Sequence, residues 1–371
     1  MSQPERRAAP VLSVMDMVPV SAGHSRTDAL TDMIALARAA DVAGYEHFWL
    51  AEHHGSTTYL SSATIVLMGQ VLAATERLGV ASGGIMLPNH APLVVAEQVG
   101  TLATLYPGRV ELGLGRAPGT DRLTAAALRR GASDPGRFAE EILEILTYLG
   151  DEPVPERLPG SLLLGASSAP DVAAQMPGPD APRVRAIPGE GTHPTVWVLG
   201  SSVNGARVAG RLGLPFAVAS HFAPVQAEAA IATYRSVLES RAEEAQGAQA
   251  LRPVPRVAAA VNVMVAPSQD EARFLFSTAM AAAARIVGNR PAPLDPPTED
   301  PQAWRAYAPG REAAVETAMS LSFVGTADDV AARLRELADR WDLDEILVVT
   351  YAHDPALRRR SYKMLAQAWR A

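Results

Sequence analysis

Short apolar segments alternate with longer segments of helical periodicity along most of the chain. Val11–Val18 is a mostly apolar run typical of a buried strand, and Asp28–Ala43 repeats its apolar residues at the spacing of an amphipathic helix. The same order of strand and helix then recurs. The predicted strands are Val11–Val18, His47–Ala51, Leu78–Leu87, Arg109–Gly115, Thr195–Leu199, Leu214–Ala219, Arg256–Ala266 and Glu345–Thr350. The predicted helices are Asp28–Ala43, Ser62–Arg77, Leu93–Tyr106, Gly136–Leu149, Asn204–Leu212, Val225–Ala245, Gln269–Ile286, Glu312–Ser320, Ala327–Trp341 and Pro355–Trp369.

The alternation predicts a parallel sheet, because a helix between two strands returns the chain to the same end of the sheet. Eight strands with intervening helices are what an α/β fold of the (β/α)8 or TIM barrel type requires. We therefore expect one domain over residues 1–371. Two proline-rich excursions, at about 151–194 and 288–310, interrupt the pattern, and the first includes an expected hairpin at Ser161–Ala166. Serines at the start of Ser62–Arg77 are expected to cap that helix.

The alternative fold is an open, doubly wound sheet, which would need a glycine-rich phosphate fingerprint after the first strand. The residues that follow the first strand contain no such pattern. Gly113–Gly119 resembles the fingerprint superficially, but its spacing is wrong and Pro118 stands where a helix would begin. The barrel is therefore the favoured architecture.

Composition narrows the classes of partner. The chain has a formal net charge of −7, so neither nucleic acid nor an anionic membrane is an expected partner. It has no cysteine, which excludes disulfides, thiolate metal sites and cysteine nucleophiles. No segment has the ~18 consecutive apolar residues of a membrane span, and the N-terminus is polar. We expect a cytoplasmic protein.

Histidines gather where the predicted strands end. Five of the eight histidines lie there, namely His53, His54, His90, His221 and His353. In a (β/α)8 barrel this end of the strands holds the active site. Each of these residues also has a structural interpretation, as a packing or capping residue, and the adjacent His53 and His54 cannot both point the same way. The clustering nevertheless predicts an active site.

Arg116 and the pair Ser201-Ser202 follow two strands that are neighbours in the predicted barrel. A guanidinium group suits a phosphate or a carboxylate, and a helix beginning after the serines offers free N–H groups to the same anion. The alternatives are a surface ion pair for Arg116 and a simple helix cap for the serines. Gly83-Gly84, inside a predicted strand, indicates either a flat ring lying against the backbone or a kink required by barrel packing.

Metal-dependent hydrolysis is disfavoured. Metallohydrolases built on this barrel usually place a His-x-His pair at the end of the first strand. The first strand here carries Ser13 and Asp16 and no histidine. We expect no metal site.

Five segments together resemble the luciferase-like flavin monooxygenases, specifically the subgroup of FMN-dependent, alkanal-type oxidoreductases. The resemblance extends over nearly the whole chain and keeps the order of the family's motifs. The segments are Phe48–His54, Gly83–Gln98, Leu105–Thr120, Val196–Ser202 and Leu212–Phe216.

The resemblance implies a monooxygenase that uses reduced FMN and O2, through a flavin C4a-hydroperoxide, on a small organic substrate that we do not identify. It implies a separate NAD(P)H:flavin reductase and a homodimer formed through the helices after the second and third strands. The implied catalytic residues are His53 and its neighbour His54. The implied cofactor-binding residues are Gly83, Gly84, Met86, Arg116, Ser201, Ser202 and Gly205. A cis peptide bond often occurs in the family at the position of Gly83-Gly84. We further expect His221 and His353 to face the substrate.

Departures from the family pattern limit these expectations. Gly115 stands where the luciferase catalytic subunit has a cysteine, and Ser201 and Gly205 replace an acidic residue and a threonine of its phosphate loop. Light emission is therefore not expected. Two further hypotheses stay open on the same barrel: hydride transfer with the deazaflavin F420, and a flavin-binding or partner subunit without catalytic activity.

Overall fold

The strands form a closed, parallel barrel. The computed structural model describes residues 10–117, 120, 122–128, 135–150, 184–244 and 256–371. Eight strands pair in the order β10-β1-β2-β3-β5-β6-β7-β8, and β8 pairs with β10 to close the barrel. Their bounds are β1 Val11–Asp16, β2 His47–Leu50, β3 Gly79–Ser82, β5 Val110–Gly115, β6 Thr195–Gly200, β7 Phe216–Val218, β8 Val257–Val265 and β10 Glu345–Val349. The predicted (β/α)8 barrel and its eight strands are confirmed.

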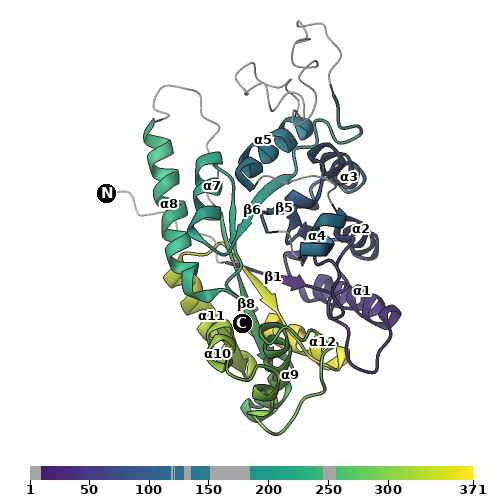
Figure 1. Ribbon diagram of the computed structural model, residues 1–371, viewed down its shortest axis with the longest axis vertical. Helices are drawn as coiled ribbons and strands as arrows, with labels where there is room; N and C mark the ends of the chain where they lie inside the picture. The colour runs from purple at the N-terminus through teal and green to yellow at the C-terminus, as the bar shows by residue number, and fades with distance from the viewer. Residues whose placement is uncertain (1–9, 118–119, 121, 129–134, 151–183, 245–255) are drawn as a thin grey trace, which may run out of the picture.

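Helices surround the barrel (Figure 1), with α1, α2 and α3 on one side of the strands and α7, α8 and α11 on the other. Their bounds are α1 Arg26–Ala43, α2 Thr64–Ala74, α3 Pro92–Leu105, α4 Arg122–Leu128, α5 Phe138–Leu149, α7 Val203–Leu212, α8 Ala227–Glu244, α9 Gln269–Val287, α10 Glu312–Ala318, α11 Ala327–Trp341 and α12 Pro355–Arg370. Helix α1 illustrates the local rules. Ser25 and Asp28 form a capping box at its start, and Gly44, in the left-handed region at φ 73°, ends it.

Three local features differ from the prediction. The expected strand Leu78–Leu87 is divided into β3 and a short strand β4, Ile85–Met86, by a cis peptide bond between Gly83 and Gly84. A further strand, β9 (Ser322–Gly325), pairs with the end of β8, and neither it nor α4 was expected. The expected serine cap of α2 is wrong: the helix begins after Ala63, and no side chain caps it.

The structure describes the whole of the second proline-rich excursion but only the last part of the first. Most of the first, including the expected hairpin at Ser161–Ala166, lies outside the described residues. The second contains a short 3-10 helix, Ala303–Tyr307, and lies against the loops that follow β1 and β2. Leu294 bridges Ser21, and the Thr58 hydroxyl donates to the Ala292 carbonyl at 2.8 Å. The second excursion therefore covers part of the C-terminal end of the barrel.

Side chains fill the interior of the barrel. Two large aromatic residues, Trp49 and Trp197, meet edge to face with ring centroids 5.3 Å apart. Small and larger apolar residues lie around them in the same cluster. The small residues are Ala81, Ala217, Ala258 and Ala260. Alternation of large and small residues lets eight strands close around a packed core.

A buried network of charged groups closes the N-terminal end of the barrel. Glu345 accepts hydrogen bonds from His47 Nδ1 and Trp49 Nε1, both at 2.9 Å. Arg256 bridges Glu345 and Glu111, at 3.3 Å to each carboxylate. The network was not predicted from the sequence, because its members come from three different strands and the segment before β8.

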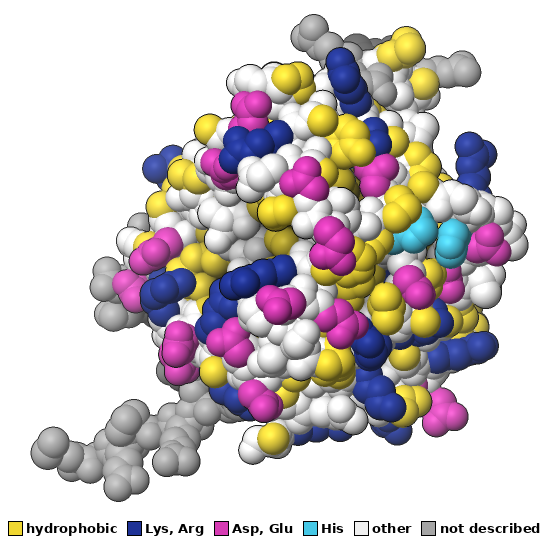
Figure 2. All heavy atoms as spheres, turned by 90° about the horizontal axis from the view of Figure 1, so that it is seen from below, with side chains coloured by type: hydrophobic (Ala, Val, Ile, Leu, Met, Phe, Trp, Pro, Cys, Tyr) yellow, Lys and Arg dark blue, Asp and Glu magenta, His cyan; other side chains and the backbone are white. Residues whose placement is uncertain are grey.

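The outer surface carries mixed charge. Figure 2 shows one face, on which Lys and Arg side chains alternate with Asp and Glu side chains without a large area of either sign. In the part of the chain that the structure describes, no helix has the length and apolarity needed to cross a membrane.

Candidate active site

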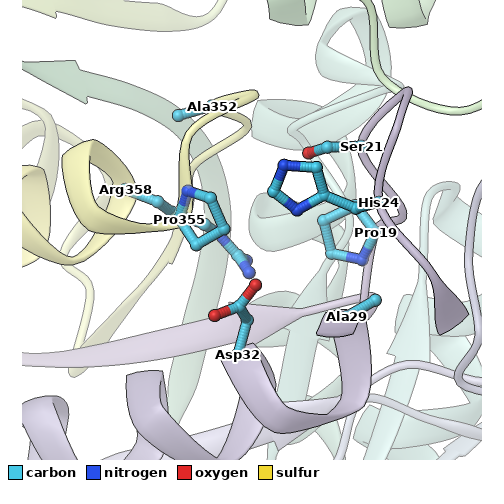
Figure 3. A pocket seen from close by; sticks show the side chains of 8 residues that line it. All are labelled: Pro19, Ser21, His24, Ala29, Asp32, Ala352, Pro355 and Arg358. Carbon is cyan, nitrogen blue, oxygen red and sulfur yellow. The ribbon is translucent and has the colours of Figure 1, made fainter. Parts of the chain in front are cut away.

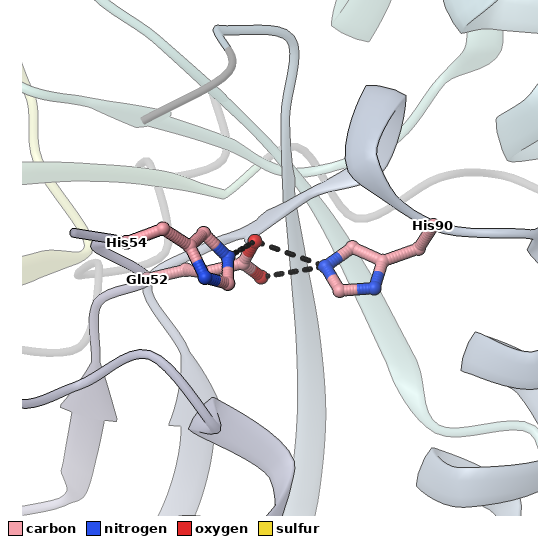
Figure 4. A group of neighbouring side chains, drawn as sticks. All are labelled: Glu52, His54 and His90. Carbon is pink, nitrogen blue, oxygen red and sulfur yellow. Dashed lines mark hydrogen bonds and ion pairs between the residues drawn. The ribbon is translucent and has the colours of Figure 1, made fainter. Parts of the chain in front are cut away.

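Glu52 is the centre of a cluster at the C-terminal end of the barrel (Figure 4). It follows β2 and is only 1% exposed. Its Oε1 lies 2.8 Å from His54 Nε2 and 2.9 Å from His90 Nε2, so one carboxylate holds both rings. Its Oε2 accepts the Met86 backbone N–H at 3.2 Å. Glu52 thereby ties the end of β2 to the segment that follows the Gly83-Gly84 peptide.

The carboxylate of Glu52 is held in its charged form. Burial raises the pKa of Glu52, but hydrogen bonds from His90, His54 and the Met86 N–H outweigh burial and lower the pKa below its ordinary value. A buried anion surrounded by donors of this kind is a rigid anchor for the groups that bind it.

His53 points away from this cluster. Its ring contacts Tyr59, with centroids 5.1 Å apart, and its buried Nδ1 has no hydrogen-bond partner. Burial lowers the pKa of His53 to about 4, although the charge of Glu52 opposes the shift. The adjacent residues His53 and His54 therefore have separate partners. His53 is uncharged at neutral pH.

His221, which follows β7, lies close enough to His53 for the two rings to interact electrostatically. It is 7% exposed, and its Nδ1 is also buried without a partner. Burial, and then the proximity of His53, lower the pKa of His221 to about 3. Asn262 of β8 donates to the His221 carbonyl at 2.6 Å and fixes the backbone there. His53 and His221 therefore share two features, a buried Nδ1 without a partner and a lowered pKa.

Arg116 and the start of α7 lie side by side. In the β5–β6 pair, Gly115 is in register with Leu199, so Arg116 follows next to Gly200, the last residue of β6, which leads into Ser201 and Ser202. Arg116 is exposed, and none of the described carboxylates forms an ion pair with it. Ser202 is the N-cap residue of α7, yet its hydroxyl makes no capping hydrogen bond. This helix start therefore keeps donors for an anion.

Glycines let α7 approach the end of β6. A Cβ atom added to Gly205 would lie 3.3 Å from the Gly200 Cα, which is tighter than ordinary contact. The close approach brings the first turn of α7 onto the end of β6, beside Arg116.

Packing inside the barrel accounts for the Gly83-Gly84 pair. A Cβ atom on Gly83 would lie 2.7 Å from the Met15 sulfur, and one on Gly84 would lie 2.8 Å from the Gly113 carbonyl oxygen. A side chain at Gly84 would displace the backbone of β5, whereas one at Gly83 would force the Met15 side chain to move. The packing interpretation of the glycines is therefore sufficient by itself, and a ring lying along this backbone is an additional use of it.

His353 lies next to the cavity that Figure 3 shows, since it contacts Ser21 and His24, which line that cavity. Its Nε2 is 3.0 Å from the Ala22 carbonyl, and the Ser21 hydroxyl donates to the His353 carbonyl at 2.7 Å. These contacts place it against the loop after β1. A cavity beside this loop has a volume of about 20 Å³, enough for roughly one water molecule. Its lining residues are Pro19, Ser21, His24, Ala29, Asp32, Ala352, Pro355 and Arg358.

The Glu52 cluster also has the composition of a metal site. Within the described ranges, one oxygen of Glu52 and one nitrogen each of His54 and His90 lie within 4.8 Å of one another. Two imidazoles and a carboxylate suit a transition metal. Each of the two histidine nitrogens, however, already lies within hydrogen-bond distance of Glu52. The cluster is complete as a hydrogen-bonded network.

Two site residues were not identified from the sequence as such. Tyr59 and Tyr351 stack with ring centroids 6.0 Å apart, and the Tyr351 hydroxyl contacts the Met17 sulfur. Tyr351 follows β10, so its position at a strand end was the available signal. Tyr59 lies in a loop, and only the folded chain places it beside His53.

Known proteins of similar sequence span almost all of this chain. The family model of the luciferase-like monooxygenases matches residues 12–342. The luciferase-like monooxygenase of Escherichia coli (strain K12) is 38% identical over 353 residues, which cover 95% of each chain. The uncharacterized protein YvbT of Bacillus subtilis (strain 168) is 37% identical over 366 residues, which cover 98% of each chain.

Solved structures have the same barrel. Apo-MsnO8 is 30% identical with a TM-score of 0.79, covering 97% of this chain and 98% of that one. The oxygenating constituent of 3,6-diketocamphane monooxygenase from Pseudomonas putida, in complex with FMN, is 18% identical with a TM-score of 0.65 and covers 97% of each chain. An F420-dependent secondary alcohol dehydrogenase is 15% identical with a TM-score of 0.61, covering 98% of this chain and all (100%) of that one. The last two likenesses concern the fold alone.

Proposed function

The chain belongs to the luciferase-like monooxygenase family, and from this premise we propose that it is an FMN-dependent monooxygenase of the alkanal-type subgroup. The observation that carries the proposal is the pairing of an exposed Arg116 with the uncapped start of α7, at the same end of the barrel as the buried, uncharged His53. Reduced FMN supplies the two electrons of the reaction, in which one oxygen atom of O2 enters a small organic substrate and the other leaves as water.

The residues present fit the phosphate of FMN. Arg116 offers a guanidinium group, and Ser201, Ser202 and the backbone near Gly205 offer uncharged donors at a helix N-terminus. The backbone of Gly83-Gly84 and Met86 would lie along the flavin ring. Of these residues, Met86 is held by Glu52, which accepts the Met86 backbone N–H.

His53 is proposed to hold and move protons at Nε2. Its Nδ1 is buried without an acceptor, so the proton of the neutral ring belongs on Nε2. Because burial keeps the pKa of His53 near 4, the ring is uncharged at neutral pH and can donate one hydrogen bond without adding charge. Tyr59 and Tyr351 beside it exclude water, which protects reactive oxygen species from wasteful release. His54, which is adjacent to His53 in the chain and is held by Glu52, is proposed as the second catalytic residue.

FMN is favoured over F420 as the cofactor. A relative that is 38% identical over 95% of this chain is named a luciferase-like monooxygenase, whereas the F420-dependent dehydrogenase is only 15% identical. An anaerobic titration with each reduced cofactor tests the choice, and selective, tight binding of F420 would reverse it.

Two partners belong to the proposal. A separate NAD(P)H:flavin reductase would supply reduced FMN. A homodimer would form through α2 and α3, on which Val66 and Leu105 are 65% and 64% exposed although both side chains are apolar. A monomer by light scattering at micromolar concentration would refute the dimer.

The experiment that tests the function begins with anaerobic binding of photoreduced FMN, followed by rapid mixing with oxygenated buffer. We expect the protein to bind reduced FMN and to oxidise it more slowly than free FMN oxidises, because the site protects it. Oxidation at the rate of free flavin, in both the natural protein and His53→Ala, would contradict the proposal and would favour the non-catalytic alternative.

A further inference from the structure

The turn that follows β1 contains a strained residue. Val18 has a φ of 54°, in the left-handed region, where a β-branched side chain is a genuine outlier. Such a conformation costs folding free energy and persists only where the surrounding structure fixes it, which happens most often at functional sites. The contacts of Val18 therefore show what this turn is used for.

A buried ion pair holds the turn in place. The Val18 N–H donates to Asp16 Oδ1 at 2.9 Å, and Nη2 of Arg358, from α12, donates to the same oxygen at 2.8 Å. Arg358 also donates through Nε to the Thr350 carbonyl at 2.8 Å, so its guanidinium group is fixed to the end of β10. Asp16 is fully buried and Arg358 is only 7% exposed. The ion pair thus determines the direction in which the chain leaves β1.

The chain that leaves Val18 pairs with the loop that carries Tyr59. The Leu60 N–H donates to the Val18 carbonyl at 3.0 Å. The Val20 N–H donates to the Thr58 carbonyl at 2.9 Å. These two bonds form a short antiparallel pairing, and Tyr59 lies between them. Because rotation about φ redirects the Val18 carbonyl and the residues after it, an ordinary negative φ at Val18 would break this pairing.

Tyr59 is the residue that this pairing brings to His53. The two rings have centroids 5.1 Å apart, and Tyr59 is 8% exposed. Tyr59 also meets Tyr351, at 6.0 Å between centroids. The Tyr351 hydroxyl in turn contacts the sulfur of Met17, the residue before Val18. The strained turn therefore contributes to both sides of the aromatic group that covers His53.

We propose that Asp16 and Arg358 are positioning residues of the active site. Through the strained turn at Val18 they set Tyr59 against His53. The inference rests on the proposed function for the role of His53, and it adds two residues that act only through Tyr59. The Val18 side chain, which is 1% exposed, is the second anchor of the turn. The aromatic cover of His53 is thereby in place before any ligand binds, as a preorganised site requires.

Two variants of the full-length protein separate positioning from stability. Asp16→Asn keeps an oxygen acceptor for the Val18 N–H but leaves the Arg358 charge without its counter-ion, so the urea midpoint should fall while Tyr59 keeps its position. Asp16→Leu/Arg358→Met removes both charges together with the acceptor. The urea midpoint of this double variant should stay close to that of the natural protein, whereas Tyr59 should move away from His53. A merely structural role would make the position of Tyr59 follow stability.

The chemical shifts of the His53 ring protons report where Tyr59 lies, because an aromatic ring shifts the resonances of protons near its face. Tyr59→Leu, which removes the ring, calibrates the effect. We expect the double variant to move the His53 shifts in the same direction as Tyr59→Leu and by most of the same amount, and Asp16→Asn to leave them nearly unchanged. The matched control is Asp32→Leu/Arg359→Met. This ion pair, at 3.3 Å between α1 and α12, is partly exposed, and its removal should leave the His53 shifts unchanged.

The double variant should also oxidise bound reduced FMN faster than the natural protein does and release more hydrogen peroxide, because water gains access to His53. Unchanged His53 shifts in the double variant, shifts that move as far in Asp16→Asn or in the control, or a double variant less stable than Asp16→Asn would each overturn the inference. The chemical shifts need neither flavin nor O2. Their outcome is therefore distinct from failure of the monooxygenase proposal, which the flavin oxidation experiment decides.

Discussion

One histidine lies at the start of strand β2 and another lies just beyond its end, and they differ in whether their ring nitrogens have partners. His47, at the N-terminal end, binds Glu345 through Nδ1 at 2.9 Å and lies 3.7 Å from Glu111 through Nε2. Burial lowers the pKa of His47, but the charge of Glu345 and its hydrogen bond, with Glu111, raise it above its ordinary value. His53, just beyond the C-terminal end, has an unpaired buried Nδ1 and a pKa lowered to about 4.

The comparison separates groups that stabilise the fold from groups that remain available for binding and catalysis. At the N-terminal end, charged groups satisfy one another, and the network closes the barrel beneath Trp49 and Trp197. At the C-terminal end, Glu52 satisfies His54 and His90, but within the described residues His53 and His221 each keep an unpaired Nδ1 and Arg116 forms no ion pair. Unused donors cost folding free energy and are retained where a ligand needs them. In this barrel fold the C-terminal end is also the one that carries active sites.

The largest expected effect is on catalysis at the C-terminal end. His53→Ala should lower kcat/KM for oxygenation by about a hundredfold to ten-thousandfold, the usual contribution of a general acid or base, while the melting temperature changes little. Coupled assays that follow product and hydrogen peroxide separately would detect it. Unchanged turnover in the variant would remove His53 from the mechanism.

A similar change at the N-terminal end should act on stability instead. His47→Ala removes one hydrogen-bond donor of the buried Glu345, which keeps Trp49 and Arg256, so the free energy of unfolding should fall by about 1–3 kcal/mol in a urea titration. Reduced FMN should bind the folded fraction as before. If His47→Ala instead weakened cofactor binding in protein that is still folded, the two ends would not be functionally separate.

The phosphate site should give an intermediate effect. Arg116→Ala should weaken the affinity for reduced FMN by roughly 10- to 100-fold, as expected for loss of a charge-assisted hydrogen bond. Arg207→Ala, on the exposed side of the same helix α7, is the matched control and should leave the affinity unchanged. Equal losses in both variants would indicate a general effect of charge rather than a phosphate site.

The two ends should also differ in how pH affects stability. His53 and His221 have lowered pKa values in the folded chain, so the unfolded chain binds protons there at a higher pH than the folded chain does. Stability should therefore fall as pH drops from about 6.5 towards 4. His47 has a raised pKa, so its stabilisation is fully present below about 6.5 and is lost as pH rises through its folded-state pKa. Thermal denaturation at a series of pH values tests both expectations. The double variant His53→Phe/His221→Phe should lose the decrease in stability on the acid side, and His47→Phe should lose the decrease on the alkaline side. If His47→Phe changed the acid side and the double variant changed the alkaline side, the surroundings described for both groups of histidines would be contradicted.

Metal removal should have the smallest effect. Because Glu52 already hydrogen-bonds to His54 and His90, dialysis against EDTA should change neither flavin binding nor turnover. Activity lost to EDTA and restored by Zn²⁺ or Fe²⁺, with loss of the metal response in Glu52→Gln, would instead make this cluster a metal site.

The prediction of the fold depended on local periodicity, and it succeeded where that periodicity is strong. All eight barrel strands and most helices follow from alternating apolar segments such as Val11–Val18 and Ala327–Trp341. It missed β9, a four-residue strand, because so short a segment has too little pattern to distinguish it from a loop. The sequence correctly placed histidines after the strands, but it could not show which imidazole nitrogens have a hydrogen-bond partner and which have none.

The sequence by itself determined the order of the elements, and therefore which residues end the strands and face the C-terminal end of the barrel. Hydrophobic spacing and helix-ending residues are properties of neighbouring positions, so they can be read without the fold. Only the tertiary structure decided that His53 and His221 each have a buried, unpartnered Nδ1, that His353 lies against the loop after β1, and that Glu52 binds His54 and His90. Those outcomes depend on barrel closure and on side-chain direction, which join residues far apart along the chain and which no local pattern encodes.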